Sequence, residues 1–277
     1  MSDTHTHDET AAMLAAMVPN AALVDQYAVR TLAGGITDMR GVGIAHAERD
    51  NLLIDGPTST GKSLLARTYA ASIGRPYYAV PVNVALDPST IWGQREQDDN
   101  GRWRWVWSPV AHVVMAGGVV EWQELNMAHP KQLAAFYGLL DDTRQVPVME
   151  NNGAVLRAHD ETLHIATMNY GYAGVSALND ALARRFNQRM RFDYVREVES
   201  RLLNSASLLD LAYAIRALPE VTTDLGTATL QMVERVAVAA NVDYALNQLV
   251  ETFKVHERGG VGYAVEMAAP AIAAELS

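Results

Sequence analysis

Eight consecutive residues at positions 56–63, Gly-Pro-Thr-Ser-Thr-Gly-Lys-Ser, have the types and spacing of a phosphate-binding loop, G-x-x-x-x-G-K-[ST]. Glycines let successive backbone N–H groups converge on phosphate oxygens, and a helix that starts directly afterwards adds the positive end of its dipole. In such a loop Lys62 bridges the β- and γ-phosphates, and the hydroxyl of Ser63 ligates Mg²⁺. We therefore predict that this P-loop binds ATP with Mg²⁺. The predicted nucleotide-binding residues are Gly56, Pro57, Thr58, Ser59, Thr60, Gly61, Lys62, Ser63 and Leu64.

A second group of polar residues follows the apolar run from Gly118 to Trp122. A P-loop enzyme uses one carboxylate at such a position to hold Mg²⁺ through water and another to polarise the attacking water. Here the pair reads Gln123-Glu124, so Glu124 is the predicted catalytic carboxylate, whereas neutral Gln123 offers the metal only a dipole. We expect Ser63 to contact Mg²⁺ directly and Gln123 and Glu124 to reach it through water. Because a charge is missing, we also expect slow hydrolysis.

Glu121 precedes Gln123 by two residues. Side chains alternate along a strand, so Glu121 shares the face of Gln123 and lies about 6.6 Å further back. Either Glu121 replaces part of the missing charge, or it belongs to a polar network between strands. The sequence leaves both interpretations open.

These residues must be positioned by strands that end, and helices that begin, at the site. Apolar runs predict strands, and helical periodicity predicts helices. The expected strands are 51–55, 77–82, 118–122 and 163–168, and the expected helices include 11–17, 21–32, 63–73 and 130–140. The alternation predicts an α/β fold with a parallel sheet between helices. Segments 197–218 and 227–255 are rich in alanine and leucine at helical spacing and predict an all-helical C-terminal unit.

Composition narrows the function classes. Hydrophobic residues make up 49% and charged residues 19% of the 277 residues, as in globular proteins. The net charge of −10 disfavours a nucleic-acid backbone as the partner. The chain has no cysteine, which excludes disulfides, thiolate metal sites and a cysteine nucleophile. No apolar run approaches the ~20 residues of a membrane helix, and the acidic start does not resemble a signal peptide. We expect a cytoplasmic protein without membrane contact.

The order of motifs resembles AAA+ ATPases of the MoxR-like, dynein-related branch, and within it the CbbQ/NorQ group, from about Asn51 to Asp193. The resemblance implies a three-layer αβα P-loop NTPase core followed by a small helical lid. We expect an N-terminal lead-in over 1–50, the nucleotide-binding domain over 51–195 and the lid over 196–277. Asn-Gly turns at 100–101 and 152–153 predict hairpin inserts near 92–108 and 144–158.

The resemblance also assigns roles to polar residues further along the chain. Asn169, after the run from His164 to Met168, matches the residue that orients the attacking water, although it could simply begin a turn. Arg185, with Arg184 as the second candidate, matches the arginine that a neighbouring subunit supplies to the γ-phosphate. The arginine expected near the start of a lid helix is replaced by Ala228. Either Arg235 takes its place, or the coupling between nucleotide and lid is weaker.

The first hairpin carries a cationic and aromatic segment, Arg102-Trp103-Arg104-Trp105-Val106-Trp107. These side chains either grip a substrate in the pore of a ring, or the tryptophans pack the base of the hairpin. Both interpretations remain open at this point.

Three functions fit these observations. The first is a hexameric ring ATPase that remodels or activates a protein client, with a von Willebrand A-type partner as the resemblance suggests. The second is an ATP-binding assembly or switch protein with little or no hydrolysis, which Gln123 and Ala228 favour. The third is a DNA-directed motor of the same branch, which the acidic charge disfavours.

Overall fold

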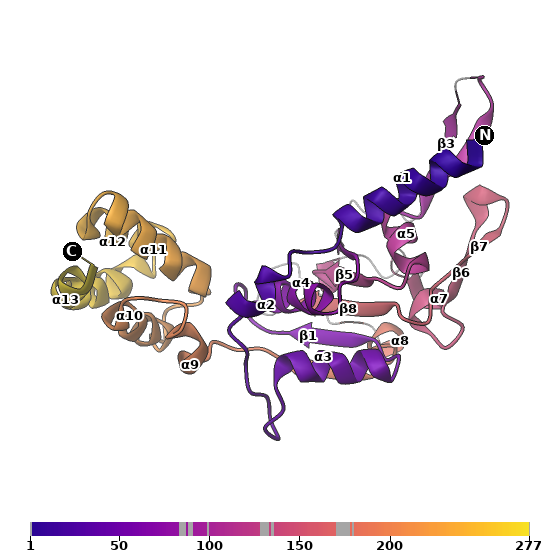
Figure 1. Cartoon of the computed structure of the whole chain (residues 1–277). Coiled ribbons are helices and arrows are strands. Elements are labelled where there is room, and N and C mark those ends of the chain that lie inside the picture. Colours follow the sequence, from indigo (N-terminus) through magenta and orange to yellow (C-terminus); the bar gives the residue numbers. More distant parts are fainter. Residues whose placement is uncertain are drawn as a thin grey trace. The chain divides into compact units, whose positions relative to one another are not determined.

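The computed structural model describes residues 2–82, 87, 91–98, 100–127, 133, 136–169, 178 and 180–276, with side chains from Asp8 onward. It divides into two compact units. The first comprises Met1–Gly56 and Gly61–Arg191, and the second comprises Pro57–Thr60 and Phe192–Ser277 (Figure 1). Within the described ranges, no helix combines the length and apolar character needed to cross a bilayer.

The first unit is built on a five-stranded parallel sheet in the order β2-β5-β8-β1-β9. Its strands are β1 (Leu52–Asp55), β2 (Tyr77–Pro81), β5 (Val119–Gln123), β8 (Leu163–Met168) and β9 (Gln188–Arg191). Every residue of β8 is buried, as expected for a strand covered on both faces. Because parallel strands end at the same edge, the residues that follow β1, β5 and β8 lie next to one another.

Helices cover both faces of this sheet. On one face Val120 and Trp122 join the hydrophobic core formed with α5 (Pro109–Met115). Glu121 and Gln123, which alternate with them, hydrogen-bond Ser63 of α4 (Lys62–Ser72) on the other face. The unit is therefore the predicted αβα sandwich, and the α/β fold class is confirmed.

The helices before the sheet differ from the prediction. They are α1 (Ser2–Ala16), α2 (Ala22–Gln26) and α3 (Asp38–Ala47). The helix predicted over 21–32 ends at Gln26, because buried Asp38 holds the following segment in an extended path. Asp38 Oδ2 accepts hydrogen bonds from the Tyr27 hydroxyl at 2.6 Å and from Arg30 N at 3.2 Å. A long-range contact of this kind leaves no periodic signal in the sequence.

Both Asn-Gly segments form antiparallel hairpins. Strands β3 (Gly93–Gln97) and β4 (Trp103–Trp107) pair in one, and β6 (Gln145–Val148) and β7 (Ala154–Arg157) pair in the other. Further short elements among the described residues of this unit are η1 (Leu125–Met127), α7 (Tyr137–Leu140), η3 (Met149–Asn151) and α8 (Asp180–Ala183). Of the helix predicted over 130–140, α7 covers the end, and 130–132 and 134–135 lie outside the described residues.

The aromatic residues of the first hairpin divide between two roles. Trp105 and Trp107 pack edge to face, with ring centroids 5.8 Å apart, and Trp105 lies against Gly93. Trp103, nearer the turn, is 67% exposed. The packing interpretation therefore holds for Trp105 and Trp107, while Trp103 remains available for contact with another molecule.

The second unit is all-helical beyond Phe192 and consists of α9 (Arg196–Glu199), α10 (Ala206–Arg216), α11 (Thr227–Ala239), α12 (Val242–Glu251) and α13 (Arg258–Leu276). The prediction of an all-helical unit is correct, and each of the two segments with helical spacing is divided into two helices at a capping residue. Ser205 accepts a hydrogen bond from Leu208 N, and Asn241 accepts one from Tyr244 N. Such side chains end one helix and start the next by satisfying its free N–H groups.

A buried ion pair ties α9 to α10 inside this unit. Arg216 donates from Nη1 and Nη2 to the two carboxylate oxygens of Glu199, each at 2.8 Å, and the Glu199 side chain is only 2% exposed. The Thr227 hydroxyl adds a third bond at 2.7 Å. Burial alone would raise the pKa of Glu199, but hydrogen bonds from Arg216 and Thr227 outweigh it and lower that pKa.

Replacing Arg216 by alanine should destabilise the second unit by about 3–5 kcal/mol, because a buried carboxylate loses its partner. Urea unfolding of the full chain measures this loss. Arg201→Ala, which breaks the exposed Arg201–Glu197 pair, is the matched control and should cost about 1 kcal/mol or less. Equal losses in the two variants would contradict the assignment.

The ion pair also predicts a pH dependence. Since the pKa of Glu199 is lower in the folded chain, its stabilising effect is complete above the ordinary value of 4.5 and is lost as the pH falls below it. The stability difference between the parent and Arg216→Ala should therefore shrink on acidification.

Candidate nucleotide-binding site

The P-loop connects the end of β1 to the start of α4. Gly61 caps α4 with a φ of 90°, a left-handed conformation that favours glycine, and no side chain occupies the cap. A helix start whose N-cap residue is a glycine in this conformation is the arrangement that receives an anion in a P-loop. Ser59 also has a positive φ of 56°.

Two side chains of the loop donate hydrogen bonds to backbone carbonyls of the loop itself. Lys62 is 7% exposed and donates from Nζ to Gly56 O at 2.9 Å. Thr60 Oγ1 donates to Pro57 O at 2.9 Å. Leu64, the last of the predicted binding residues, is 44% exposed at the first turn of α4. The loop thus keeps its ammonium group folded back on its own backbone, close to the expected phosphates.

Glu124 and Asn169 meet beyond the ends of β5 and β8. Asn169 Nδ2 donates to Glu124 Oε1 at 3.4 Å, and Asn126 Nδ2 donates to Asn169 O at 2.9 Å. Glu124 has a φ of 55°, so the chain turns sharply as it leaves the strand. The structure therefore brings together a carboxylate and an amide that are 45 residues apart in the sequence.

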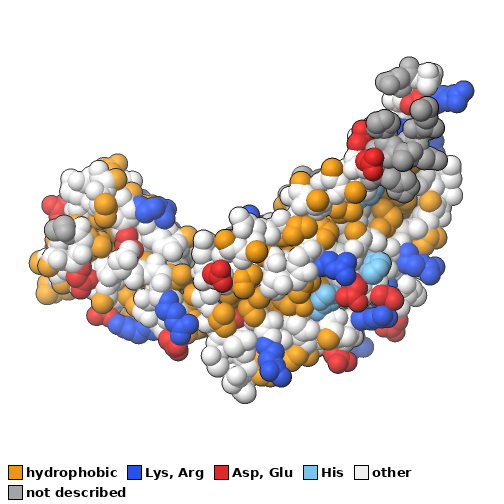
Figure 2. Space-filling model, viewed as in Figure 1, with side chains coloured by type: hydrophobic (Ala, Val, Ile, Leu, Met, Phe, Trp, Pro, Cys, Tyr) orange, Lys and Arg blue, Asp and Glu red, His pale blue; other side chains and the backbone are white. Residues whose placement is uncertain are grey.

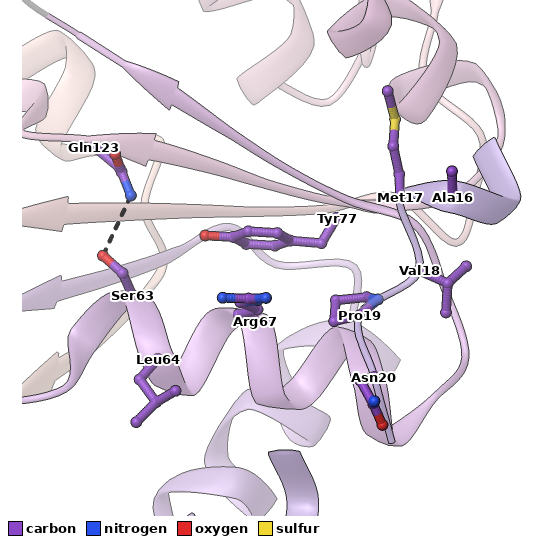
Figure 3. A pocket seen from close by; sticks show the side chains of 10 residues that line it. All are labelled: Ala16, Met17, Val18, Pro19, Asn20, Ser63, Leu64, Arg67, Tyr77 and Gln123. Atoms are coloured by element: carbon purple, nitrogen blue, oxygen red, sulfur yellow. Dashed lines mark hydrogen bonds between the residues drawn. The ribbon is translucent and has the colours of Figure 1, made fainter. Parts of the chain in front are cut away.

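Gln123 lies beside Ser63, as Figure 3 shows, with Nε2 3.4 Å from Ser63 Oγ. The shorter contact of Ser63 is to Glu121, whose Oε1 accepts the hydroxyl proton at 2.6 Å. Glu121 is fully buried and also accepts bonds from Thr167 Oγ1 at 3.0 Å and from the Tyr77 hydroxyl. The network interpretation of Glu121 is thus confirmed, and the network includes the predicted metal ligand Ser63. That Glu121 replaces part of the missing charge stays a prediction.

Tyr77 and Thr167 were not predicted from the sequence. Strand register could have pointed to Thr167, since it pairs with Gln123 in the sheet. Burial, followed by the charge of Glu121, raises the pKa of Tyr77, so its hydroxyl stays protonated and donates. In Figure 3 this hydroxyl points toward Ser63 and Gln123, with Arg67 below the ring.

The two candidate arginines follow α8 and differ in their surroundings. Arg185 donates from Nη1 to Ala181 O at 2.7 Å, and its guanidinium lies 4.4 Å from the centroid of the Tyr137 ring. Arg184 is exposed, and its side chain makes no hydrogen bond or ion pair with any residue that the structure describes. Within those residues, neither arginine hydrogen-bonds to the P-loop, Glu124 or Asn169.

Ala228 stands in the first turn of α11, and Arg235 follows seven residues later. At 1.5 Å per residue the two positions are about 10 Å apart along the helix. Both interpretations of this position, a replacement by Arg235 and a weaker coupling between nucleotide and lid, stay predictions.

The residues of the site fit ATP and Mg²⁺. Across the described ranges, no three His, Asp or Glu side chains gather closely enough to bind a metal by themselves. A cation here would depend on the Ser63 hydroxyl and on phosphate oxygens of the nucleotide, which is how Mg²⁺ is usually held with nucleotides. The P-loop backbone and Lys62 supply the complementary groups for those phosphates.

Comparison with known proteins agrees with this geometry. The model of the AAA domain (dynein-related subfamily) matches residues 51–186. An uncharacterized protein of Staphylococcus saprophyticus is 31% identical over 186 residues, which cover 65% of this chain and 70% of that protein. The chain belongs to the AAA+ family. An uncharacterized protein of Staphylococcus aureus strain USA300 is 30% identical to this AAA+ chain over 186 residues, which again cover 65% of this chain and 70% of that protein.

Solved structures are more distant from this AAA+ protein. A crystal structure from Cytophaga hutchinsonii has a TM-score of 0.47 and 15% identity, covering 94% of this chain and 85% of that one. A variant of Thermotoga maritima RuvB has a TM-score of 0.42 and 14% identity, covering 82% of this chain and 66% of that one.

Lys62→Ala should weaken ATP binding about 100-fold or more, since it removes charge-assisted contacts worth about 1.5–3 kcal/mol each. Isothermal titration calorimetry with a non-hydrolysable ATP analogue measures the loss. Lys254→Ala removes the same charge from an exposed position of the second unit and serves as the control. Unchanged affinity in Lys62→Ala would rule out this loop as the phosphate site.

Proposed function

We propose that this AAA+ chain hydrolyses ATP with Mg²⁺ and works as a ring that remodels or activates a protein client, as a MoxR-like protein near the CbbQ/NorQ group. The observation that carries the proposal is the pairing of Glu124 with Asn169 beside the P-loop, at 3.4 Å. A site that only stores a nucleotide has no use for a carboxylate and an amide placed at the γ-phosphate end.

Glu124 acts as the general base in this proposal. Its carboxylate takes a proton from a water molecule as the water oxygen bonds to the γ-phosphorus and the bond to the bridging oxygen breaks. Asn169 orients that water, and Asn126 fixes Asn169 by bonding to its backbone carbonyl. Lys62 and the P-loop N–H groups hold the phosphates, and bound Mg²⁺ would neutralise charge that develops on them.

An arginine from the neighbouring subunit completes the site in the ring that we propose. Arg185 holds the motif position, although it would have to leave the Tyr137 ring to reach a neighbour. Arg184 is exposed and could act without such a rearrangement. Figure 2 shows many hydrophobic side chains on the visible face of the sheet unit, and the exposed large ones of this unit include Val24, Ile44 and Leu64. An apolar surface of this kind supports self-association.

The client side of the proposal rests on the first hairpin. Trp103 is 67% exposed and stands between Arg102 and Arg104, both also exposed. An aromatic ring flanked by two cations suits an extended protein segment with acidic and apolar residues. A von Willebrand A-type partner would accompany the client, as in the CbbQ/NorQ group.

A switch protein that binds ATP with little hydrolysis is the second candidate. Gln123 beside Ser63 favours it, since an amide brings no charge to the metal position. Ala228 at the start of α11 favours it as well, because a lid without that arginine responds less to the γ-phosphate. Turnover by the parent chain separates the two candidates.

Glu124→Gln should reduce ATP turnover by about 10²–10⁴-fold, the usual contribution of a general base, while ATP affinity stays within about twofold. Phosphate release and analogue binding are measured on the same preparation. A parent chain that binds ATP but releases no phosphate would replace the ATPase proposal by the switch.

Arg185→Ala should reduce turnover by about 10³-fold or more without loss of ATP binding. Mixed with Glu124→Gln subunits in equal amounts, it should regain activity, because roughly a quarter of the sites then join an intact base to an intact arginine. The same experiment with Arg184→Ala in place of Arg185→Ala shows which of the two arginines acts between subunits, because only the variant of that arginine loses turnover alone and regains it in the mixture. No recovery in either mixture would exclude an arginine that acts between subunits.

A further inference from the structure

Glu121 is a buried carboxylate in the middle of β5, on the same face as Gln123 and in contact with Ser63. It has no exposed surface. Burying a charged group away from water is costly unless hydrogen bonds and a compensating charge accompany it. The groups that surround Glu121 therefore indicate the role of its carboxylate.

Four donors surround this carboxylate. Oε1 accepts from Ser63 at 2.6 Å and from Thr167 at 3.0 Å. Oε2 accepts from the Tyr77 hydroxyl and lies 3.4 Å from Gln123 Nε2. All four donors are neutral, and none of the ion pairs found among the described residues involves Glu121. The hydrogen bonds satisfy the carboxylate, while its negative charge is left without a bonded cationic side chain.

The bond from Ser63 has a specific consequence for a metal. A serine hydroxyl has one proton to donate and lone pairs to offer, and a cation can use only the lone pairs. With its proton directed at Glu121, Ser63 presents its lone pairs to the other side. A hydroxyl that ligates a metal needs a hydrogen-bond acceptor for its proton, and Glu121 is that acceptor for Ser63. Gln123 cannot fill this role in its present orientation, because its Nε2 donates to Ser63 Oγ.

We propose that Glu121 supplies the charge that Gln123 lacks, as a buried positioning residue that orients the Ser63 hydroxyl toward Mg²⁺ and balances the charge of the bound cation. This inference rests on the proposed binding of Mg²⁺ and ATP at the P-loop. The carboxylate of Glu121 lies two strand positions before Gln123, but it still contacts Ser63 at 2.6 Å. Tyr77 and Thr167 hold it in the orientation that makes this contact. Glu121 orients a ligand and does not contact the nucleotide, so it is not a catalytic residue.

The test measures how the binding of a fluorescent, non-hydrolysable ATP analogue depends on Mg²⁺. In Glu121→Gln the shape of the side chain is kept and the charge is lost, so the Mg²⁺ concentration at half-effect should rise about tenfold or more. Binding of the analogue without Mg²⁺ should stay the same or improve. Thr167→Val removes one of the groups that hold Glu121 but keeps the charge, so its Mg²⁺ midpoint should rise far less than that of Glu121→Gln.

A charge relocation makes the test independent of folding defects. Glu121→Gln combined with Gln123→Asp returns a carboxylate to the neighbouring position and should recover most of the Mg²⁺ response. Gln123→Asp alone should not improve it, because the new carboxylate would stand close to Glu121 and like charges oppose each other. Thermal unfolding of every variant shows whether the network itself is intact.

The outcomes separate the two proposals. If Glu121→Gln has the same Mg²⁺ midpoint as the parent chain and only its unfolding temperature falls, the proposed role of Glu121 is wrong. Glu121 would then serve only the hydrogen-bond network between the strands. Improved Mg²⁺ response in Gln123→Asp alone would overturn the proposed role as well. If the parent chain binds no analogue at any Mg²⁺ concentration, the proposed function itself fails.

Discussion

The position of β8 between β5 and β1 is the constraint on which the site depends. Three strands that are far apart in the sequence run in the same direction and end at one edge, so the P-loop, Glu124 and Asn169 are neighbours before any side chain contact forms. β8 is buried throughout, and its register with β1 places Met168 beside Asp55, so the residues that follow the two strands lie at the same edge. The chemistry of the site is in this sense a result of strand order.

Burial also strengthens the interactions of the polar side chains inside the sheet. Hydrogen bonds and charges act more strongly where water is absent, and an unsatisfied group there is correspondingly costly. Glu121 is tolerated because hydroxyls from β2, β8 and α4 converge on it. One side chain thereby links the sheet to the first turn of the P-loop helix, so the stability of the sheet and the orientation of Ser63 depend on the same contacts.

Local patterns allowed much of this to be predicted from the sequence, and long-range contacts account for the rest. The P-loop, the four predicted strands and the two hairpins carry short-range signals that consist of glycines, apolar runs and Asn-Gly turns. The end of α2 at Gln26 depends on Asp38, twelve residues later, and the edge strand β9 is only four residues long. The neighbours of Glu121 come from three other elements, so spacing along the chain could place Glu121 on a face but could not find Tyr77.

Glu124 has a backbone conformation that glycine would adopt more easily. A left-handed φ of 55° costs a residue with a side chain about 1–2 kcal/mol, and glycine would relieve that strain at an entropic cost of about 0.5–1 kcal/mol. Substitution by glycine would thus leave the chain equally stable or more stable while removing the only proton acceptor proposed for the reaction. At this position, selection for a stable fold and selection for turnover act in opposite directions, and a glutamate persists there only as long as its chemistry is useful to the organism.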